Sequence, residues 1–508
     1  MDAPPADKFL YRAFTSVAAL GDYLYIEGGE IKIAGDEVIS RPVNSTLSLP
    51  LKSSWKTSSA PLNSINKGSA PTVKQPALWP SPDGKTIYSW GGEGPWADEA
   101  GAKNRSLWAF TPDSFGGGTW GVQQPASANS FAAIHRTGRA LYTSCGQIGL
   151  SVSGFGVSNT DEFFPDPRKE IPVSGLITYE MDSRTWSNKT AVPALQPQYG
   201  WLWGAGTCMP PRNKTDHLAF FLGGAKTSST SIDFPKLADF SNITFYDPKA
   251  DRWYWQTTTG TVPRGRTLHC AVGVSGKNDT HEIFVYGGTN TAVNSVDAYN
   301  DLFILTIPGF HWTQANVISP PRQLHSCAHA GNSQMIVVGG WESAAFNWPP
   351  GPDQWPLGIG VFDMKQLSWR DSYDANAADY DTPDDIQRWY AGGSSNTPKE
   401  QKSSSTGTIV GGTIGGVALL ALIGLFYFLW KRRKAAAKAS PTKEREYESP
   451  HYPGLELPGD EYYASKEYGN VSKTPQEHDS AWNMDRGAKY PMREPQELET
   501  QYHRAELA

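Results

Sequence analysis

Histidine is the residue type in this chain whose spacing comes closest to that of a metal site. Seven histidines precede residue 408, namely His135, His217, His269, His281, His311, His325 and His329. His325 and His329 are four residues apart, so on a β-strand their side chains would point to the same face. Two imidazoles suit a copper ion, but such a pair often arises by chance, and the sequence has no P-loop, HExxH, CxxC or nucleophile-elbow motif. We therefore predict no catalytic residue, no metal site and no cofactor.

Aromatic side chains close to acidic ones form a second group with chemical potential. Their rings, next to hydrogen-bonding groups, suit sugars or the hot spots of protein interfaces. We predict that the binding residues are Trp96, Asp98, Phe163, Phe164, Trp341, Trp348 and Trp355. The alternative is that several of these rings only pin their own loops.

An internal repeat must position these groups. Apolar runs that are rich in β-forming residues end at a glycine pair, whose first members are Gly28, Gly91, Gly223, Gly287 and Gly339. In the third copy, Cys145 takes this place. One tryptophan follows in each copy, at Trp55, Trp120, Trp186, Trp253, Trp312 and Trp369, with separations of 65, 66, 67, 59 and 57 residues. We expect the glycines to allow close packing of adjacent units and the tryptophans to fill the core between them.

Each copy contains four apolar segments, which predicts a unit of four antiparallel strands. Repetition of such units around a ring leaves few exposed sheet edges, so we predict an all-β fold, a six-bladed β-propeller. Strand direction places every connection between second and third strands on one face. These connections are long, at residues 30–43, 93–103, 147–172, 225–241, 289–300 and 341–357, and they contain the predicted binding residues.

The glycine pairs and the fourth-strand tryptophans resemble the kelch repeat, over roughly residues 12–372. Arg266 and His269, like Arg322 and His325, match the R-x-x-H of kelch first strands, where we expect a buried hydrogen-bond network that the first four units lack. With the apolar stretch described below, the chain resembles the kelch-repeat single-pass membrane proteins of filamentous fungi. This resemblance implies a propeller used as an interaction surface.

An enzyme alternative comes from the same resemblance. Galactose oxidase, a copper radical oxidase, uses a kelch-type propeller whose metal is held by two histidines, a tyrosine and a cysteine-linked tyrosine. Neither the tyrosine nor the cysteine motif of that family can be matched here, so we predict that the protein is not an enzyme.

Residues 408–430 contain no charged side chain and predict one transmembrane helix. A helix of this length spans roughly 34 Å. Lys431, Arg432, Arg433 and Lys434 follow directly, which places the C-terminal side in the cytosol and the N-terminal side outside, as expected for a plasma-membrane protein. A secretory signal is missing from the given N-terminus, so we expect that this end is incomplete.

The predicted domains are a propeller over residues 1–374, a flexible stalk over 375–407, the membrane helix over 408–430 and a disordered cytosolic tail over 431–508. Within the stalk, IQRWYA at residues 386–391 is predicted to add a closing strand to the ring. Tyrosines and Ser/Thr-Pro sites in the tail could recruit kinases or trafficking adaptors.

The predicted outer part contains all four cysteines and six N-glycosylation sequons. The sequons begin at Asn44, Asn104, Asn188, Asn213, Asn242 and Asn278, and we expect a seventh, at Asn470 in the tail, to stay unmodified. The cysteines could form disulfides in an oxidising compartment or stay free, and their pairing cannot be read from the sequence.

A net charge of −6 shows no basic excess that would suggest nucleic acid. We predict a membrane-anchored propeller that binds a protein or a cell-wall carbohydrate. The alternatives are an oxidase of the galactose oxidase type and a structural wall-associated protein without a specific ligand.

Overall fold

The computed structural model describes residues 3–95, 106–166, 169–189, 200–209, 217–227, 236–277, 280–291, 297–342 and 351–392. The chain divides into two units, Met1–Ser403 and Ser404–Ala508, and all of the described residues belong to the first unit. Within these ranges no helix is long and apolar enough to cross a membrane. The predicted transmembrane helix at 408–430, the tail and the end of the stalk lie outside the described residues.

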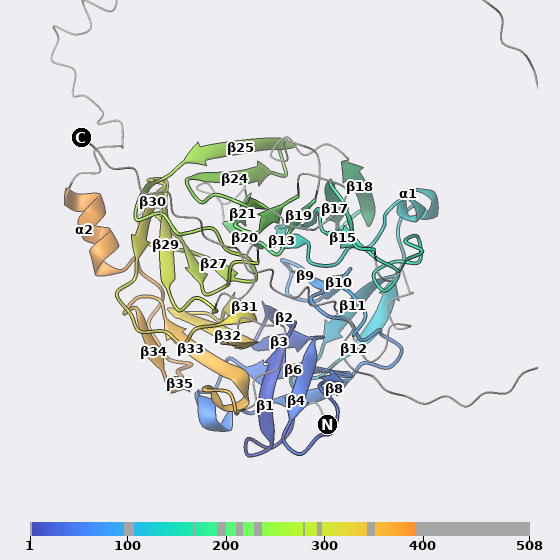
Figure 1. Cartoon of the computed structure of the whole chain (residues 1–508), viewed down its shortest axis with the longest axis horizontal. Coiled ribbons are helices and arrows are strands. Elements are labelled where there is room, and N and C mark those ends of the chain that lie inside the picture. The colour runs from blue at the N-terminus through green and yellow to red at the C-terminus, as the bar shows by residue number, and fades with distance from the viewer. Residues whose placement is uncertain are drawn as a thin grey trace, which may run out of the picture. The chain divides into compact units, whose positions relative to one another are not determined.

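Six antiparallel sheets, numbered one to six along the chain, form the first unit, and each is built from consecutive parts of the sequence (Figure 1). Sheet one consists of β2 (Ser16–Leu20), β3 (Tyr23–Glu27), β6 (Ser45–Pro50) and β8 (Asn63–Asn66). Sheet two consists of β9 (Ala77–Pro80), β10 (Ile87–Trp90), β11 (Leu107–Pro112) and β12 (Gly118–Gln123). Sheet three consists of β13 (Leu141–Cys145), β14 (Ile148–Val152), β17 (Leu176–Glu180) and β18 (Thr185–Lys189).

The later sheets follow the same order. Sheet four consists of β20 (Ala205–Met209), β21 (Leu218–Leu222), β24 (Asn242–Asp247) and β25 (Arg252–Thr257). Sheet five consists of β27 (Cys270–Ser275), β28 (His281–Tyr286), β29 (Leu302–Ile307) and β30 (His311–Gln314), and the short β26 (Thr259–Gly260) joins it parallel to β30. Sheet six consists of β31 (Gln323–His329), β32 (Gln334–Trp341), β33 (Ile359–Asp363) and β34 (Ser368–Arg370).

The sheets surround one axis, as Figure 1 shows. Their first strands contact one another in the closed order β2, β9, β13, β20, β27, β31 and back to β2. A separate apolar core fills the space between each pair of neighbouring sheets, including that between sheets six and one, where Ile336 and Val361 pack with Leu24 and Leu47. This mostly β, antiparallel architecture agrees with the all-β part of the prediction and is consistent with a β-propeller.

A belt of backbone hydrogen bonds runs around much of the axis at the start of the first strands. One residue per sheet has a positive φ there, and these residues are Phe14, Gln75, Arg139, Trp203, Leu268 and Leu324. Gln75 donates its N–H to the Phe14 carbonyl, at 2.8 Å. Leu268 donates to Trp203 at 2.8 Å, Leu324 to Leu268 at 3.1 Å, and Phe14 to Leu324 at 3.3 Å. The belt therefore joins the last sheet to the first through the backbone.

Segments from both ends of the unit also close the ring. β1 (Phe9–Ala13), which precedes sheet one, contacts β32 of sheet six. β35 (Ser372–Tyr373), which follows sheet six, pairs antiparallel with β7 (Trp55–Lys56). Trp55 stacks on Tyr373 with ring centroids 5.3 Å apart.

The prediction of an extra closing strand at residues 386–391 is wrong, because this segment is helical. It belongs to α2 (Asp384–Gly392). Ile386 is buried, and Trp389 and Tyr390 are half-buried, so the apolar positions follow the i, i+3, i+4 spacing of a helix face. Asp384 and Asp385 lie in the first turn, where negative charge favours a helix.

The alignment of the third repeat also needs correction. LYTSC at residues 141–145 is the first strand of its sheet, not the second, and β14 follows it as the second strand. The glycine pair is replaced by Ser153, with φ 56°, and Gly154. Cys145 therefore does not occupy the glycine position.

Close approach between sheets explains the first glycine of each pair. A Cβ atom on Gly339 would lie 2.6 Å from the carbonyl oxygen of Arg12 on β1, just before sheet one, and its φ of 74° disfavours other residues. The repeated tryptophans lie on the fourth strands, except Trp55, which lies on β7. All six belong to, or pack against, the cores between sheets.

All four cysteines form disulfides between first strands of neighbouring sheets. Cys145 of sheet three bonds to Cys208 of sheet four, and Cys270 of sheet five bonds to Cys327 of sheet six. Each bridge therefore ties two adjacent sheets together beside the axis.

Candidate interaction face

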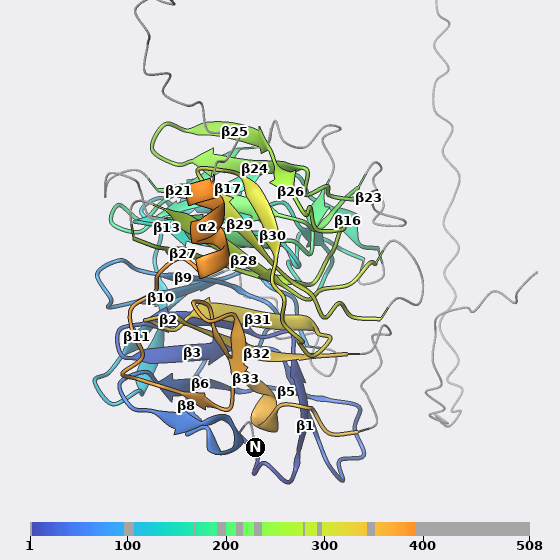
Figure 2. The same cartoon turned by 90° about the vertical axis from the view of Figure 1, so that its left-hand side faces the viewer.

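The long connections between second and third strands contain much of the remaining regular structure. β4 (Glu30–Ile33) pairs with β1 and with β5 (Arg41–Pro42), and β22 (Ala225–Lys226) pairs with β19 (Trp201–Leu202) and β23 (Lys236–Leu237). β15 (Phe155–Gly156) pairs with β16 (Ile171–Pro172). β1 and β19 directly precede first strands, so these small sheets lie where first strands begin and second strands end. Figure 2 shows β5, β16 and β23 on one side of the ring. We call this side the loop face.

Phe163 is the predicted binding residue with the most exposed ring among those the structure describes. Its side chain is 58% exposed, and its ring stacks on His135 with centroids 3.9 Å apart and an interplanar angle of 22°. The buried Phe164 supports the stack edge-on at 5.2 Å from Phe163. One face of the Phe163 ring is thus held by the protein while much of the side chain meets solvent.

The buried Asp161 side chain connects the two segments that form this site. Its carboxylate is buried and accepts hydrogen bonds from the backbone N–H groups of Arg136 and Phe163, both at 2.9 Å. His135 Nδ1 lies 4.0 Å from Asp161 Oδ1. The carboxylate therefore couples the two segments, one before sheet three and one within its long connection, that carry the stacked rings.

The other predicted binding residues are distributed differently. Trp341 is completely buried and contacts Phe14 edge-on, with centroids 5.8 Å apart. Trp355 is half-buried, stands 4.0 Å from the Arg322 guanidinium and packs against Trp369. Trp341 thus packs in the core beside Phe14, and Trp355 is held between Arg322 and Trp369. Trp96, Asp98 and Trp348 lie outside the described residues.

Charged side chains near the belt are held in place by one another. Arg139 lies over the rings of Phe155 and Trp203, at 4.4 Å and 5.0 Å, and its guanidinium is 3.8 Å from Glu93. Lys74 forms a buried pair with Glu93 at 3.4 Å. Burial alone would raise the pKa of the Glu93 carboxyl, but Lys74 and Arg139 hold it below its ordinary value. These groups build the scaffold beneath the loop face.

A cavity of about 320 Å³ lies among the first strands. Small side chains and backbone line much of it, including Ser16, Ser144, Gly206, Gly273 and Ser326. Its walls come from all six sheets, as expected for a space on the ring axis.

The histidines do not assemble a metal site within the described residues, where no cluster of three potential ligands occurs. His325 Nε2 lies 3.2 Å from the Tyr286 carbonyl oxygen, and His329 Nε2 lies 2.8 Å from that of Asn332. Burial, together with nearby Arg322, lowers the pKa of His325 to about 3. Because all four cysteines are in disulfides, none is available for the cysteine-linked tyrosine of the oxidase alternative.

The R-x-x-H arginines do form buried networks. Arg266 donates to the Gly287 carbonyl at 2.9 Å and pairs with Asp301 at 2.6 Å. Arg322 donates to the carbonyls of Gly339 and Gly340, both at 2.9 Å, and pairs with Asp353 at 2.6 Å.

The R-x-x-H motif is absent from the first four units, but unit one has a buried arginine at the corresponding place. Arg12 stands two residues before the positive-φ residue Phe14, as Arg266 stands before Leu268, and it is also buried. Thr15 replaces the histidine there, which hid the match in the sequence.

No family model matches the chain. A kelch repeat-containing protein of Arthroderma benhamiae is 24% identical over 400 residues, which cover 70% of this chain and 56% of the relative. The host cell factor homolog hcf-1 of Caenorhabditis elegans is 31% identical over 136 residues, covering 24% of this chain and 16% of the relative. The chain thus spans about half of the first relative and less of the second, and these similarities support placing it with the kelch-repeat proteins.

Proposed function

We propose that the described residues form a six-bladed kelch-type propeller, one blade per sheet, that binds a protein partner through the loop face. The observation that carries this proposal is the exposed Phe163 ring, fixed on His135 at the loop face. A preorganised, partly exposed aromatic ring can bury a large area in a partner at little cost in entropy. The similarity to a kelch repeat-containing protein supports the propeller, and a cell-wall carbohydrate is the second candidate ligand because aromatic faces also suit sugars.

A photo-crosslinking amino acid at position 163 tests the partner in intact cells. We expect a discrete crosslinked product at this position and none at position 115. Phe115 is the matched control because it is 86% exposed in the turn between β11 and β12, at the other end of the strands. Equal products from both positions, or none from position 163, would argue against the loop face.

Phe163→Ala is expected to weaken binding of the crosslinked partner by on the order of 10-fold or more, the loss typical of a central aromatic contact. Phe115→Ala should leave affinity unchanged. Both variants should melt like the unmodified protein, because both rings are largely exposed. A glycan array probed with the same variants decides whether a carbohydrate is the ligand instead.

The proposal extends to location: the propeller lies outside the cell, anchored by residues 408–430, with a cytosolic tail that recruits adaptors or kinases. Two disulfides support an oxidising compartment. The sequon residues Asn44, Asn188 and Asn242 are exposed, as glycosylation requires, whereas Asn104, Asn213 and Asn278 lie outside the described residues.

Glycosidase treatment is expected to reduce the apparent mass of the cellular protein. Asn44→Gln, Asn188→Gln and Asn242→Gln should each remove one glycan, and the control Asn470→Gln should remove none. A protein that is insensitive to the enzyme, or a glycan at Asn470, would contradict the proposed orientation.

A further inference from the structure

Residues 374–392, which we call the strap, leave sheet six and cross to sheet five. The strap begins against sheet six, where Gln334 Nε2 donates to the Asp374 carbonyl at 2.7 Å and Asp374 N–H donates back to Gln334 Oε1 at 2.9 Å. It ends as α2, whose Trp389 stacks on His311 of β30 with ring centroids 4.5 Å apart. Tyr380 and Ile386 are buried in the core between sheets five and six.

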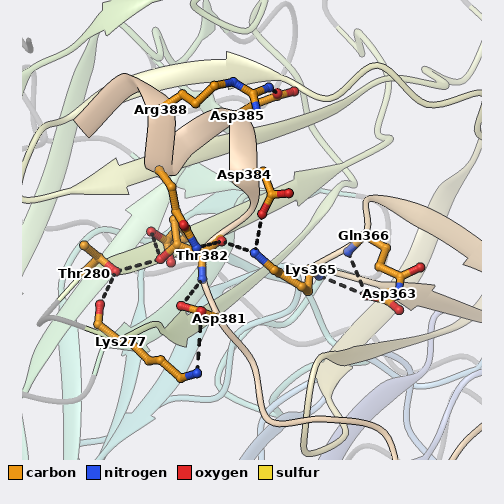
Figure 3. A network of polar contacts seen from close by, with 12 residues as sticks. Lys277, Thr280, Asp363, Lys365, Gln366, Asp381, Thr382, Asp384, Asp385 and Arg388 are labelled. Atoms are coloured by element: carbon orange, nitrogen blue, oxygen red, sulfur yellow. Dashed lines mark hydrogen bonds and ion pairs between the residues drawn. The ribbon is translucent and has the colours of Figure 1, made fainter. Parts of the chain in front are cut away.

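Polar contacts clamp the middle of the strap, as Figure 3 shows. Lys365 donates to the Thr382 carbonyl at 2.8 Å and pairs with Asp384 at 2.6 Å. Lys277 lies 3.7 Å from Asp381. The ammonium groups in this network therefore neutralise carboxylates of the strap itself.

Glu282 of β28 lies beneath the strap and has no ammonium group beside it among the described residues. Its side chain is completely buried, and within the described residues it takes part in no ion pair. Tyr380 donates its hydroxyl to Glu282 Oε2 at 3.0 Å, and Thr382 donates to Oε1 at 3.2 Å. Thr280 Oγ1 lies 2.8 Å from Thr382 Oγ1 and completes a chain of hydroxyl groups. The strap thus covers a carboxyl group that is surrounded by neutral hydroxyls.

The other neighbours of Glu282 supply no positive charge. Its cross-strand partners are Val274 on β27 and Thr306 on β29. The adjacent His281 places Nδ1 2.9 Å from the hydroxyl of Ser275. The titratable groups that the strap turns toward Glu282 are Tyr380, Asp381 and Tyr390, all neutral or negative at physiological pH.

We propose that the strap is a releasable clasp, whose hold on sheets five and six weakens when the Glu282 carboxyl loses its proton. An ionised carboxylate sealed under the strap lacks both water and a cation, whereas release of the strap would hydrate it. The clasp is therefore tightest in acid and looser near neutral pH.

The direction of the pH effect follows from the proton balance. Burial raises the pKa of Glu282 to about 7, against the opposing effect of the Tyr380 and Thr382 hydroxyls. The released strap leaves the carboxyl in water, where its pKa returns to the ordinary value of 4.5. The closed form holds the proton between these two values and the open form does not, so closing is favoured below pH 4.5 and loses its advantage as pH rises through about 7.

Hydrogen–deuterium exchange on the full chain tests the clasp. Peptides from residues 380–392 are compared with peptides from β32 between about pH 5 and pH 8, after correction for the intrinsic pH dependence of exchange. We expect strap exchange to rise on the order of 10- to 100-fold across this range while β32 stays protected. Equal protection of the strap at both pH values would overturn the proposal.

Glu282→Gln identifies the group responsible. Its strap peptides should show no pH dependence, whereas the control Asp385→Asn, at an exposed carboxylate of α2, should keep that of the unmodified chain. A pH dependence that survives Glu282→Gln would assign the effect to another group and overturn the proposal. If Glu282→Gln opens the strap at every pH, the titration of the unmodified chain, with its expected midpoint near neutrality, decides the question.

Discussion

Trp312→Ala is expected to lower the free energy of unfolding by about 3–5 kcal/mol, the cost of truncating a fully buried aromatic side chain. Trp312 is completely buried between sheets four and five, where it packs on Phe240 at 5.7 Å. Its indole N–H donates to the Phe240 carbonyl at 3.1 Å, so truncation leaves a cavity and also removes a buried hydrogen bond.

Denaturant unfolding measures the loss of stability for three tryptophans that differ in burial, in the variants Trp312→Ala, Trp253→Ala and Trp255→Ala. Trp253→Ala should cost less than Trp312→Ala because Trp253 is only half-buried. Trp255→Ala should stay within about 0.5 kcal/mol of the unmodified protein, since its side chain is 71% exposed. Trp482→Ala, in the predicted tail, should cost nothing. Equal losses for Trp312 and Trp255 would show that burial between sheets does not determine the cost.

Arg322→Gln is expected to destabilise the fold by a comparable amount, about 3–5 kcal/mol, because it leaves a buried carboxylate without its cation. Asp353 pairs with Arg322 at 2.6 Å and is completely buried. The same guanidinium donates to the carbonyls of Gly339 and Gly340, so the substitution also loses contacts at the glycine pair of sheet six.

An exposed pair in the same sheet provides the control. Arg370 lies 3.2 Å from Asp363, and the Arg370 side chain is 40% exposed, so Arg370→Gln should cost less than about 1 kcal/mol. Arg322→Met combined with Asp353→Leu should recover part of the loss, since neither charge is then left alone. Unfolding curves of Arg322→Gln and Arg370→Gln that coincide would contradict a structural role for the buried pair.

The repeat could be read from the sequence because its signals are local. A glycine such as Gly339 is required by its positive φ and by the carbonyl of Arg12, and no other residue type satisfies both conditions without strain. The repeated tryptophans are a second local signal. Five of the six lie on fourth strands, where each fills the space beside its own sheet.

The third repeat was aligned wrongly because its first strand ends in Cys-Gly, which resembles the glycine pair that ends a second strand in the other repeats. Cys145-Gly146 looks like a degenerate glycine pair, yet it forms the turn between β13 and β14. The true position holds Ser153, a non-glycine residue at positive φ, which a search for glycine pairs cannot find. The disulfide partner of Cys145, 63 residues away, was likewise invisible without the order of the sheets.

The candidate site was harder to predict because exposure is a tertiary property. Phe163 and Phe164 are neighbours in sequence, but only Phe163 faces solvent. Trp341 looked equally available, yet it continues β32 into the core beside Phe14. Nothing in the sequence indicated that His135, 28 positions before Phe163, would support its ring.

The pairing of β7 with β35 has a consequence for synthesis of the chain. Trp55 is made early, but Tyr373, the residue it stacks on, leaves the ribosome only after all six sheets have been translated. Until then, the apolar side of sheet one that later meets sheet six lacks its partner. A nascent chain must therefore expose this apolar surface through most of translation, and a chaperone that covers it has its greatest value during that interval.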